Sequence, residues 1–203
     1  MTCNDYFEEI DTKYGILLET MKGHLSKKRW DHVIGTAKKA YELSEQYGAN
    51  IYQAVLAAYF HDYFREVSKK EMILLAENYL KSISDDEYEK PSLLHGKVAA
   101  AYFEQEGLIT DKVVREAIRC HTLGKPGMDD IAKILYICDA IEETWNYPSV
   151  EELRHYVAHH SLDESFLYVI KDLIIELIKD HQIVYFETVE TYNKEVEVNR
   201  WQV

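Results

Sequence analysis

The chain has 203 residues, and its 36 Asp and Glu outnumber its 23 Lys and Arg to give a formal net charge of −13. A partner of duplex DNA or RNA needs a cationic surface that releases counterions, so this balance argues against nucleic-acid polymers and leaves small nucleotides open. Hydrophobic residues form 47% of the chain, which is enough for a folded core without disulfide support.

The cysteines and the first residues of the chain indicate its compartment. Cys3, Cys120 and Cys138 are an odd set without a C-x-x-C pair, which argues against a disulfide framework and a cysteine-rich zinc site. Residues 1–15 lack the pattern of a secretory signal, and no run approaches the roughly 20 apolar residues that span a bilayer. We therefore expect a cytoplasmic protein with no membrane partner.

Apolar residues recur at helical spacing along nearly the whole chain, and only 3 prolines and 8 glycines interrupt them. Residues 1–23 predict an amphipathic N-terminal helix. Ser68 and Glu71 predict a capping box that opens a later helix. The remaining helices are expected, in chain order, over 26–48, 50–62, 93–106, 110–121, 128–142, from Pro148 onward, and over 163–181.

Two segments depart from this pattern. Residues 82–91 are polar and predict a flexible loop. Residues 184–203 are rich in Val, Thr and Tyr, so we expect a short C-terminal tail that is extended in part. Because no repeat or flexible linker divides the chain, the prediction is a single all-α domain over residues 1–203.

The adjacent His61 and Asp62 end an apolar helix. Neighbours on a helix differ by about 100° around its axis, so both can face one point only near a helix end. There a carboxylate can bridge two cations while the imidazole binds one of them. By itself such a pair is more often a capping Asp beside a partly buried His.

The pair is not isolated, because other polar side chains stand at the ends of helices or on apolar faces. These are His32, His95, His121 and Asp139. Asp139 interrupts the apolar run 134–141, where a charge is costly unless it is paired or bound to a metal. Four imidazoles and two carboxylates could surround two divalent ions, and this donor set suits Fe, Mn or Zn better than Mg or Ca.

In this order the residues resemble the HD superfamily of metal-dependent phosphohydrolases. More narrowly, they resemble the bacterial YqeK family of symmetrical diadenosine tetraphosphate hydrolases. The matching segments begin with Arg29-Trp-Asp-His32, Ala58-Tyr-Phe-His61-Asp62, Leu93-Leu-His95-Gly96 and His121-Thr-Leu-Gly124. They continue with Tyr136-Ile-Cys-Asp139-Ala-Ile-Glu142, 147–154 and 188–193. The similarity covers about residues 24–193.

The resemblance implies a helical HD domain with a dinuclear centre, with iron as the expected metal and Mn or Zn as alternatives. By position, one ion would be held by His32, His61, Asp62 and Asp139. His95 and His121 would hold the other, and Asp62 would bridge the two as the catalytic carboxylate. The oligomeric state stays open, with a homodimer as one option.

The residues expected to contact the substrate follow this pattern less closely. Trp145 stands where the family has an Arg that could bind phosphate, and it could instead stack on a nucleobase. Arg29 and Arg65 each lie three residues from an expected ligand and could bind phosphate or form structural ion pairs. Lys125 follows His121 in a glycine-containing loop and has the same two alternatives.

The implied reaction is in-line attack by a metal-bound hydroxide on diadenosine tetraphosphate, which yields two ADP. Three alternatives remain at this stage. The chain could hydrolyse another nucleotide, it could use a diiron centre as an oxygenase, or it could be a non-catalytic sensor of a metal or nucleotide.

Overall fold

The computed structural model describes residues 1–199, which contain only helices and no strand. This confirms the predicted all-α class. The elements are α1 (Cys3–His24), α2 (Lys27–Tyr47), α3 (Ile51–Phe60), α4 (Lys69–Tyr79), α5 (Asp85–Glu89), the 3-10 helix η1 (Pro91–Leu94), α6 (His95–Gln105), α7 (Lys112–Cys120), α8 (Asp130–Ile141), α9 (Val150–Val157), α10 (Leu162–Lys179) and α11 (Phe186–Asn199).

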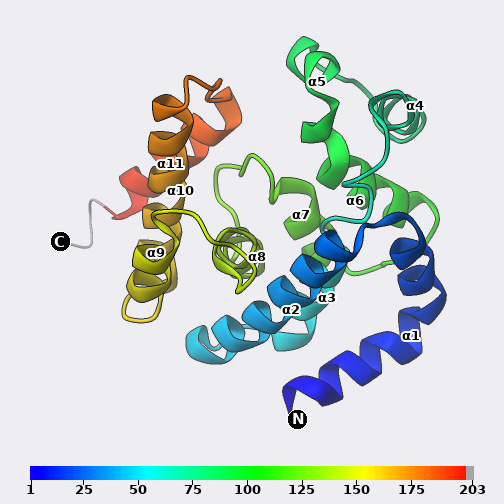
Figure 1. The fold of residues 1–203 in the computed structure, drawn as a ribbon, viewed down its shortest axis with the longest axis horizontal. Coiled ribbons are helices and arrows are strands. Elements are labelled where there is room, and N and C mark those ends of the chain that lie inside the picture. Colours follow the sequence, from blue (N-terminus) through cyan, green and yellow to red (C-terminus); the bar gives the residue numbers. More distant parts are fainter. Residues whose placement is uncertain (200–203) are drawn as a thin grey trace.

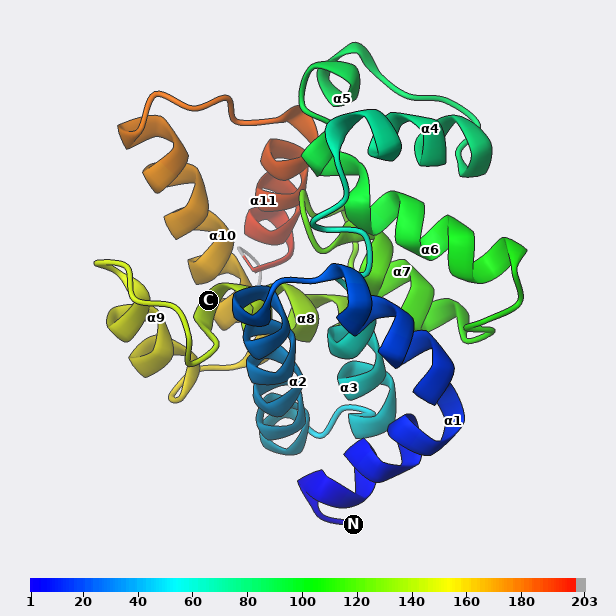
Figure 2. The same cartoon turned by 45° about the vertical axis from the view of Figure 1, so that its right-hand side comes forward.

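Helix α3 lies at the centre of this arrangement and packs on α2, α7 and α8. All its residues from Ala54 to Phe60 are buried, as expected for a helix that is apolar on every side. In Figures 1 and 2, α1 lies on the outer side of the α2–α3 pair, with α9 and α10 on one flank and α4 and α6 on the other. The C-terminal end of α3 therefore lies in the interior of the protein.

Local capping sets most helix starts near their predicted positions. Ser26 accepts from the backbone N–H of Arg29 at the start of α2, and Ser68 accepts from that of Glu71 at the start of α4. In the helix predicted over 110–121 the expected cap is Thr110, but Asp111 supplies the capping carboxylate, so α7 begins at Lys112.

The predicted extended tail is wrong for residues 186–199, which form α11. Its buried residues, Thr188, Thr191 and Glu195, face other parts of the chain. The hydroxyl of Thr188 donates to the carbonyl of Leu123 at 2.9 Å, and buried Glu195 accepts from Lys133 of α8 at 2.9 Å. These contacts outweigh the weak strand propensity of the segment. Residues 200–203 of the predicted tail lie outside the described part.

The predicted loop at 82–91 contains the short helix α5. Ser84 and Glu87 form a capping box at its start, and Lys97 of α6 donates to Glu87 at 2.6 Å. Within residues 1–199, no helix combines the length and the apolar character needed to cross a membrane.

Candidate metal centre

The end of α3 brings two adjacent polar side chains into the protein interior. The helix ends at Phe60, and His61 and Asp62 continue into a turn. This change of direction lets neighbouring residues face one point, which a regular helix does not allow. Nε2 of His61 lies 3.5 Å from Oδ2 of Asp62. Both side chains are buried.

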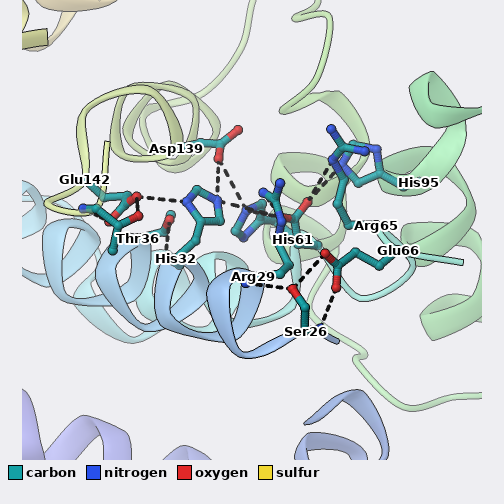
Figure 3. Close-up of polar contacts among 12 residues, drawn as sticks. Ser26, Arg29, His32, Thr36, His61, Arg65, Glu66, His95, Asp139 and Glu142 are labelled. Carbon is teal, nitrogen blue, oxygen red and sulfur yellow. Dashed lines mark hydrogen bonds and ion pairs between the residues drawn. The ribbon is translucent and has the colours of Figure 1, made fainter. Parts of the chain in front are cut away.

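Two neighbouring helices add a histidine and a carboxylate. Nε2 of His32 on α2 lies 3.0 Å from Oδ1 of Asp139 on α8, and Nε2 of His61 lies 3.5 Å from the same oxygen. Figure 3 shows Asp139 reaching toward both imidazoles. His32, His61 and Asp139 thus form one group whose ligand atoms could hold an ion.

A second group forms where α6 and α7 meet. His95 opens α6, His121 directly follows α7, and their Nε2 atoms lie 2.9 Å apart. Oδ1 of Asp62 lies 3.1 Å from Nε2 of His95, whereas Oδ2 faces His61. His61, Asp62 and His121 form a second set of potential ligands. The structure therefore brings together all six predicted ligands, with the two Asp62 oxygens directed to different imidazoles.

The close approach of α6 to α7 depends on Gly96. A Cβ at this position would lie 2.5 Å from the carbonyl oxygen of Ile118 and 2.9 Å from the ring of His121. A side chain here would force the two helices apart and separate His95 from His121.

The outer ring nitrogens determine which atom of each histidine faces the cluster. Nδ1 of His61, His95 and His121 lies 2.7–2.8 Å from the backbone carbonyl three residues earlier. Because a carbonyl can only accept, each Nδ1 carries a hydrogen, and in the neutral imidazole Nε2 keeps its lone pair. Nδ1 of His32 lies 3.0 Å from a carboxylate oxygen of Glu142. Such outer contacts are typical of metal-binding histidines.

The inner nitrogens lack the partners that a metal-free interior requires. Nε2 of His32 and Nε2 of His61 are buried and make no well-aligned hydrogen bond, although Oδ1 of Asp139 lies 3.0 Å from the first and 3.5 Å from the second. The facing Nε2 atoms of His95 and His121 both carry lone pairs, which repel unless a proton or a cation lies between them. Imidazole nitrogens and carboxylate oxygens are common ligands of divalent transition metals. The residues of this cluster therefore fit a metal centre.

The charges of the cluster are unevenly distributed. Burial opposes protonation of His32, but the carboxylates of Asp139 and Glu142, each 3.0 Å from one ring nitrogen, outweigh it and raise the pKa of His32 to about 9. Burial and neighbouring imidazoles lower the pKa of His121 to about 3. Burial also opposes ionisation of Asp62 and Asp139, yet adjacent histidines hold both pKa values well below the usual range. The site thus offers two carboxylates at neutral pH.

Glu142 is a site residue that the sequence analysis did not identify. Its buried carboxylate accepts from Thr144 as well as contacting Nδ1 of His32. The space comes from Gly35 of α2, where a Cβ would collide with Oε2 of Glu142. Figure 3 shows Glu142 on the outer side of His32. The sequence signal that could have identified Glu142 is its position three residues after Asp139, on the same side of α8.

A cavity of about 540 Å³ opens beside the cluster. Its wall includes Asp62, His95, His121 and Asp139 from the cluster, and the arginines Arg29 and Arg65. Further apolar and aromatic residues extend it between α8, α9 and α10; these are Trp145, Tyr147, Pro148, Leu153, Val169 and Leu173.

The two arginines predicted to contact substrate lie beside the Asp62 carboxylate. Nη1 of Arg29 lies 2.8 Å from Oδ2 of Asp62, and Nε of Arg65 lies 4.0 Å from Oδ1. The cationic side of the cavity therefore adjoins the predicted metal ligands.

Trp145 and Lys125 are placed differently. The indole N–H of Trp145 donates to the carbonyl of Asp139 at 2.6 Å, and its ring packs against the edge of His32 with centroids 5.2 Å apart. Trp145 thus covers the cluster and lines the cavity. Lys125 instead pairs with Glu116 and lines a separate small cavity, so the structure does not bring it to the site.

The chain matches the HD domain family model over residues 29–144, a range that contains all six predicted ligands. The chain belongs to the HD-domain family. A symmetrical bis(5'-nucleosyl)-tetraphosphatase of Halalkalibacterium halodurans is 37% identical over 89% of this chain and 95% of the relative. One of Bacillus subtilis is 35% identical over 87% of this chain and 94% of the relative.

Fold comparison gives the same family. A solved structure from Clostridium acetobutylicum, described as a predicted HD superfamily hydrolase involved in NAD metabolism, has a TM-score of 0.84 and 26% identity. The match covers 91% of this HD-domain chain and 97% of the other. The resemblance drawn from the sequence is therefore confirmed, and the chain is an HD-domain hydrolase.

Proposed function

We propose that this HD-domain hydrolase cleaves diadenosine tetraphosphate symmetrically into two ADP with the help of two divalent cations. The observation that carries the proposal is the convergence of four Nε2 atoms and the Asp62 and Asp139 carboxylates in one cluster, of which Asp62, His95, His121 and Asp139 line a cavity of about 540 Å³. The names of the relatives from Halalkalibacterium halodurans and Bacillus subtilis support the substrate.

The six ligands divide into two sets around Asp62. His32, His61 and Asp139 would hold one cation, and His95 with His121 would hold the other. Asp62 would bridge the two, because Oδ1 faces His95 while Oδ2 faces His61. Mixed imidazole and carboxylate ligands suit Fe(II), with Mn(II) and Zn(II) as alternatives. When bound, such cations lower the pKa of a coordinated water and neutralise charge on phosphoryl oxygens.

The cavity has a cationic part beside the cluster and an apolar part, with the carboxylates Asp172, Glu176 and Asp180 also in its lining. Arg29 and Arg65 supply positive charge beside Asp62, where the phosphate chain would lie. Tyr147, Leu153 and Leu173 form an apolar wall farther from the cluster, where a nucleobase would bury its faces. Trp145 also lines the cavity, and its ring packs against His32 and shields it from water.

Product analysis tests this proposal. Protein purified without oxygen and loaded with Fe(II) or Mn(II) is incubated with diadenosine tetraphosphate, and the nucleotides are separated by ion-exchange chromatography. We expect ADP as the sole product. AMP with ATP would contradict symmetrical cleavage, whereas turnover of a different nucleotide would identify another HD-type substrate.

The same experiment addresses the other classes. Full turnover without oxygen contradicts an oxygenase. Tight nucleotide binding without any product, in protein that contains both metals, would contradict the enzyme and favour a sensor.

A further inference from the structure

Tyr136 has a buried hydroxyl that is not part of the metal cluster. The residue lies on α8, one turn before Asp139, and only 4% of its surface is exposed. Its hydroxyl is buried and has no hydrogen-bond partner, and the residue lines the cavity that adjoins the cluster. Burying a hydroxyl without a partner is unfavourable, so such a group in a ligand cavity indicates a partner that arrives with the ligand.

The ring of Tyr136 is held in place by the core. It packs edge to face on fully buried Phe166 of α10, with centroids 5.2 Å apart and an interplanar angle of 88°. The ring cannot turn toward solvent without breaking this contact. The residue is therefore fixed in the cavity lining, along with His121 and Asp139.

The surroundings define what the hydroxyl can bind. Burial, with a further contribution from the Asp139 carboxylate, raises the pKa of Tyr136 well above its ordinary value. The group therefore stays protonated at physiological pH and acts as a neutral hydrogen-bond donor. Arg29 and Arg65 line the cavity beside Asp62, whereas Asp172, Glu176 and Asp180 of the α10 side also line it. We therefore expect the anionic part of a ligand at the arginine side, next to the cluster.

We propose that the Tyr136 hydroxyl donates a hydrogen bond to a non-bridging phosphoryl oxygen of the bound nucleotide. This inference rests on the proposed function, because it places the phosphate chain beside the metal cluster. The phosphate chain of the nucleotide would then lie between Tyr136 on α8 and the two arginines. Since the contact is made to an oxygen that is already charged in the bound nucleotide, it contributes to binding more than to the chemical step.

Tyr136→Phe tests the inference, because it removes the hydroxyl and keeps the ring. With Mn(II)-loaded protein we expect an unchanged metal content and an affinity for ADP about tenfold weaker by calorimetry. For diadenosine tetraphosphate we expect KM to rise by about the same factor with little change in kcat. The melting temperature of the metal-free variant should equal or exceed that of the wild type, since no bond is lost.

Tyr47→Phe is the matched control. The Tyr47 hydroxyl donates to the carbonyl of Val157 at 3.0 Å and lies outside the cavity. We expect this variant to melt at a lower temperature and to keep its affinity for ADP. A Tyr136→Phe protein with wild-type ADP affinity, whether or not it is destabilised, would overturn the inference.

The binding measurement separates this inference from the proposed function. A wild type that binds ADP but does not cleave diadenosine tetraphosphate would contradict the function, while weaker ADP binding by Tyr136→Phe would still support the contact. A wild type that binds neither ADP nor inorganic tripolyphosphate would overturn the Tyr136 inference as well.

Discussion

Two groups of histidines in this chain differ in where their partners come from. The buried group, defined as His32, His61, His95 and His121, is gathered from segments far apart in the sequence. The surface group, defined as His155, His159 and His160, lies at the end of α9. His155 and His159 have the i, i+4 spacing that could bind a metal, and their ring centroids are 4.5 Å apart.

The outer contacts of the two groups are alike, because Nδ1 of His159 and of His160 also lies near a backbone carbonyl. The two groups differ in the ligands that lie near their other ring nitrogens. Asp62 and Asp139 complete the buried group, whereas no third ligand within residues 1–199 joins His155 and His159. A carboxylate brought in by another segment thus distinguishes a candidate metal centre from histidines that are merely close together in sequence.

Removing a ligand should produce the largest effect. We expect His61→Ala and Asp62→Ala to lose bound metal and to lower kcat/KM by about 1000-fold or more, because each side chain belongs to the proposed metal-binding sets. Metal content by elemental analysis and turnover of diadenosine tetraphosphate provide the measurement, with circular dichroism to verify the helices. His159→Ala, from the surface group, should leave both unchanged. Full activity in either buried variant would refute the site assignment.

Glu142 provides a smaller test of the same comparison, since no surface histidine has an equivalent carboxylate on its outer nitrogen. Glu142→Gln keeps the shape but weakens the contact to Nδ1 of His32, so we expect metal affinity to fall by about 10–100-fold. Competition with a chelator measures this affinity. The matched control is Glu143→Gln, whose side chain is 76% exposed. Equal affinities in the two variants would contradict an orienting role for Glu142.

The pH dependence of the metal-free protein should show the smallest effect. Nearby carboxylates overcome burial to raise the pKa of His32 to about 9, and that of His61 is also raised. A raised pKa stabilises the fold below the ordinary value of about 6.5, and this stabilisation is lost as the pH rises through about 9. We expect the free energy of unfolding to fall by on the order of 2 kcal/mol between pH 6.5 and 9.

Urea unfolding at several pH values, with a chelator present, measures this change. His32→Asn should flatten the dependence, whereas His159→Ala should preserve it. A wild-type stability that stays constant over the range would show that His32 is not held in its protonated form.

The sequence was most informative where its signals are local. Helical periodicity predicted the all-α class, and Ser26 and Ser68 marked helix starts that the structure contains. The tail was mispredicted because its Val, Thr and Tyr content is a weak local signal. Burial of Thr188 and Glu195 against residues more than 60 positions away outweighs it.

For the candidate site, too, the sequence supplied one part of the information and the tertiary structure supplied the other. The order and flanks of His61, Asp62 and the other four ligands identified the family from the sequence alone. Periodicity cannot tell which nitrogen of a histidine faces inward, that Lys125 pairs with Glu116, or that the Tyr136 hydroxyl stays without a partner. Residue type and spacing therefore determined the helices and the set of candidate ligands. Only the tertiary structure decided the partners of each side chain, because those partners come from helices that the sequence does not place next to one another.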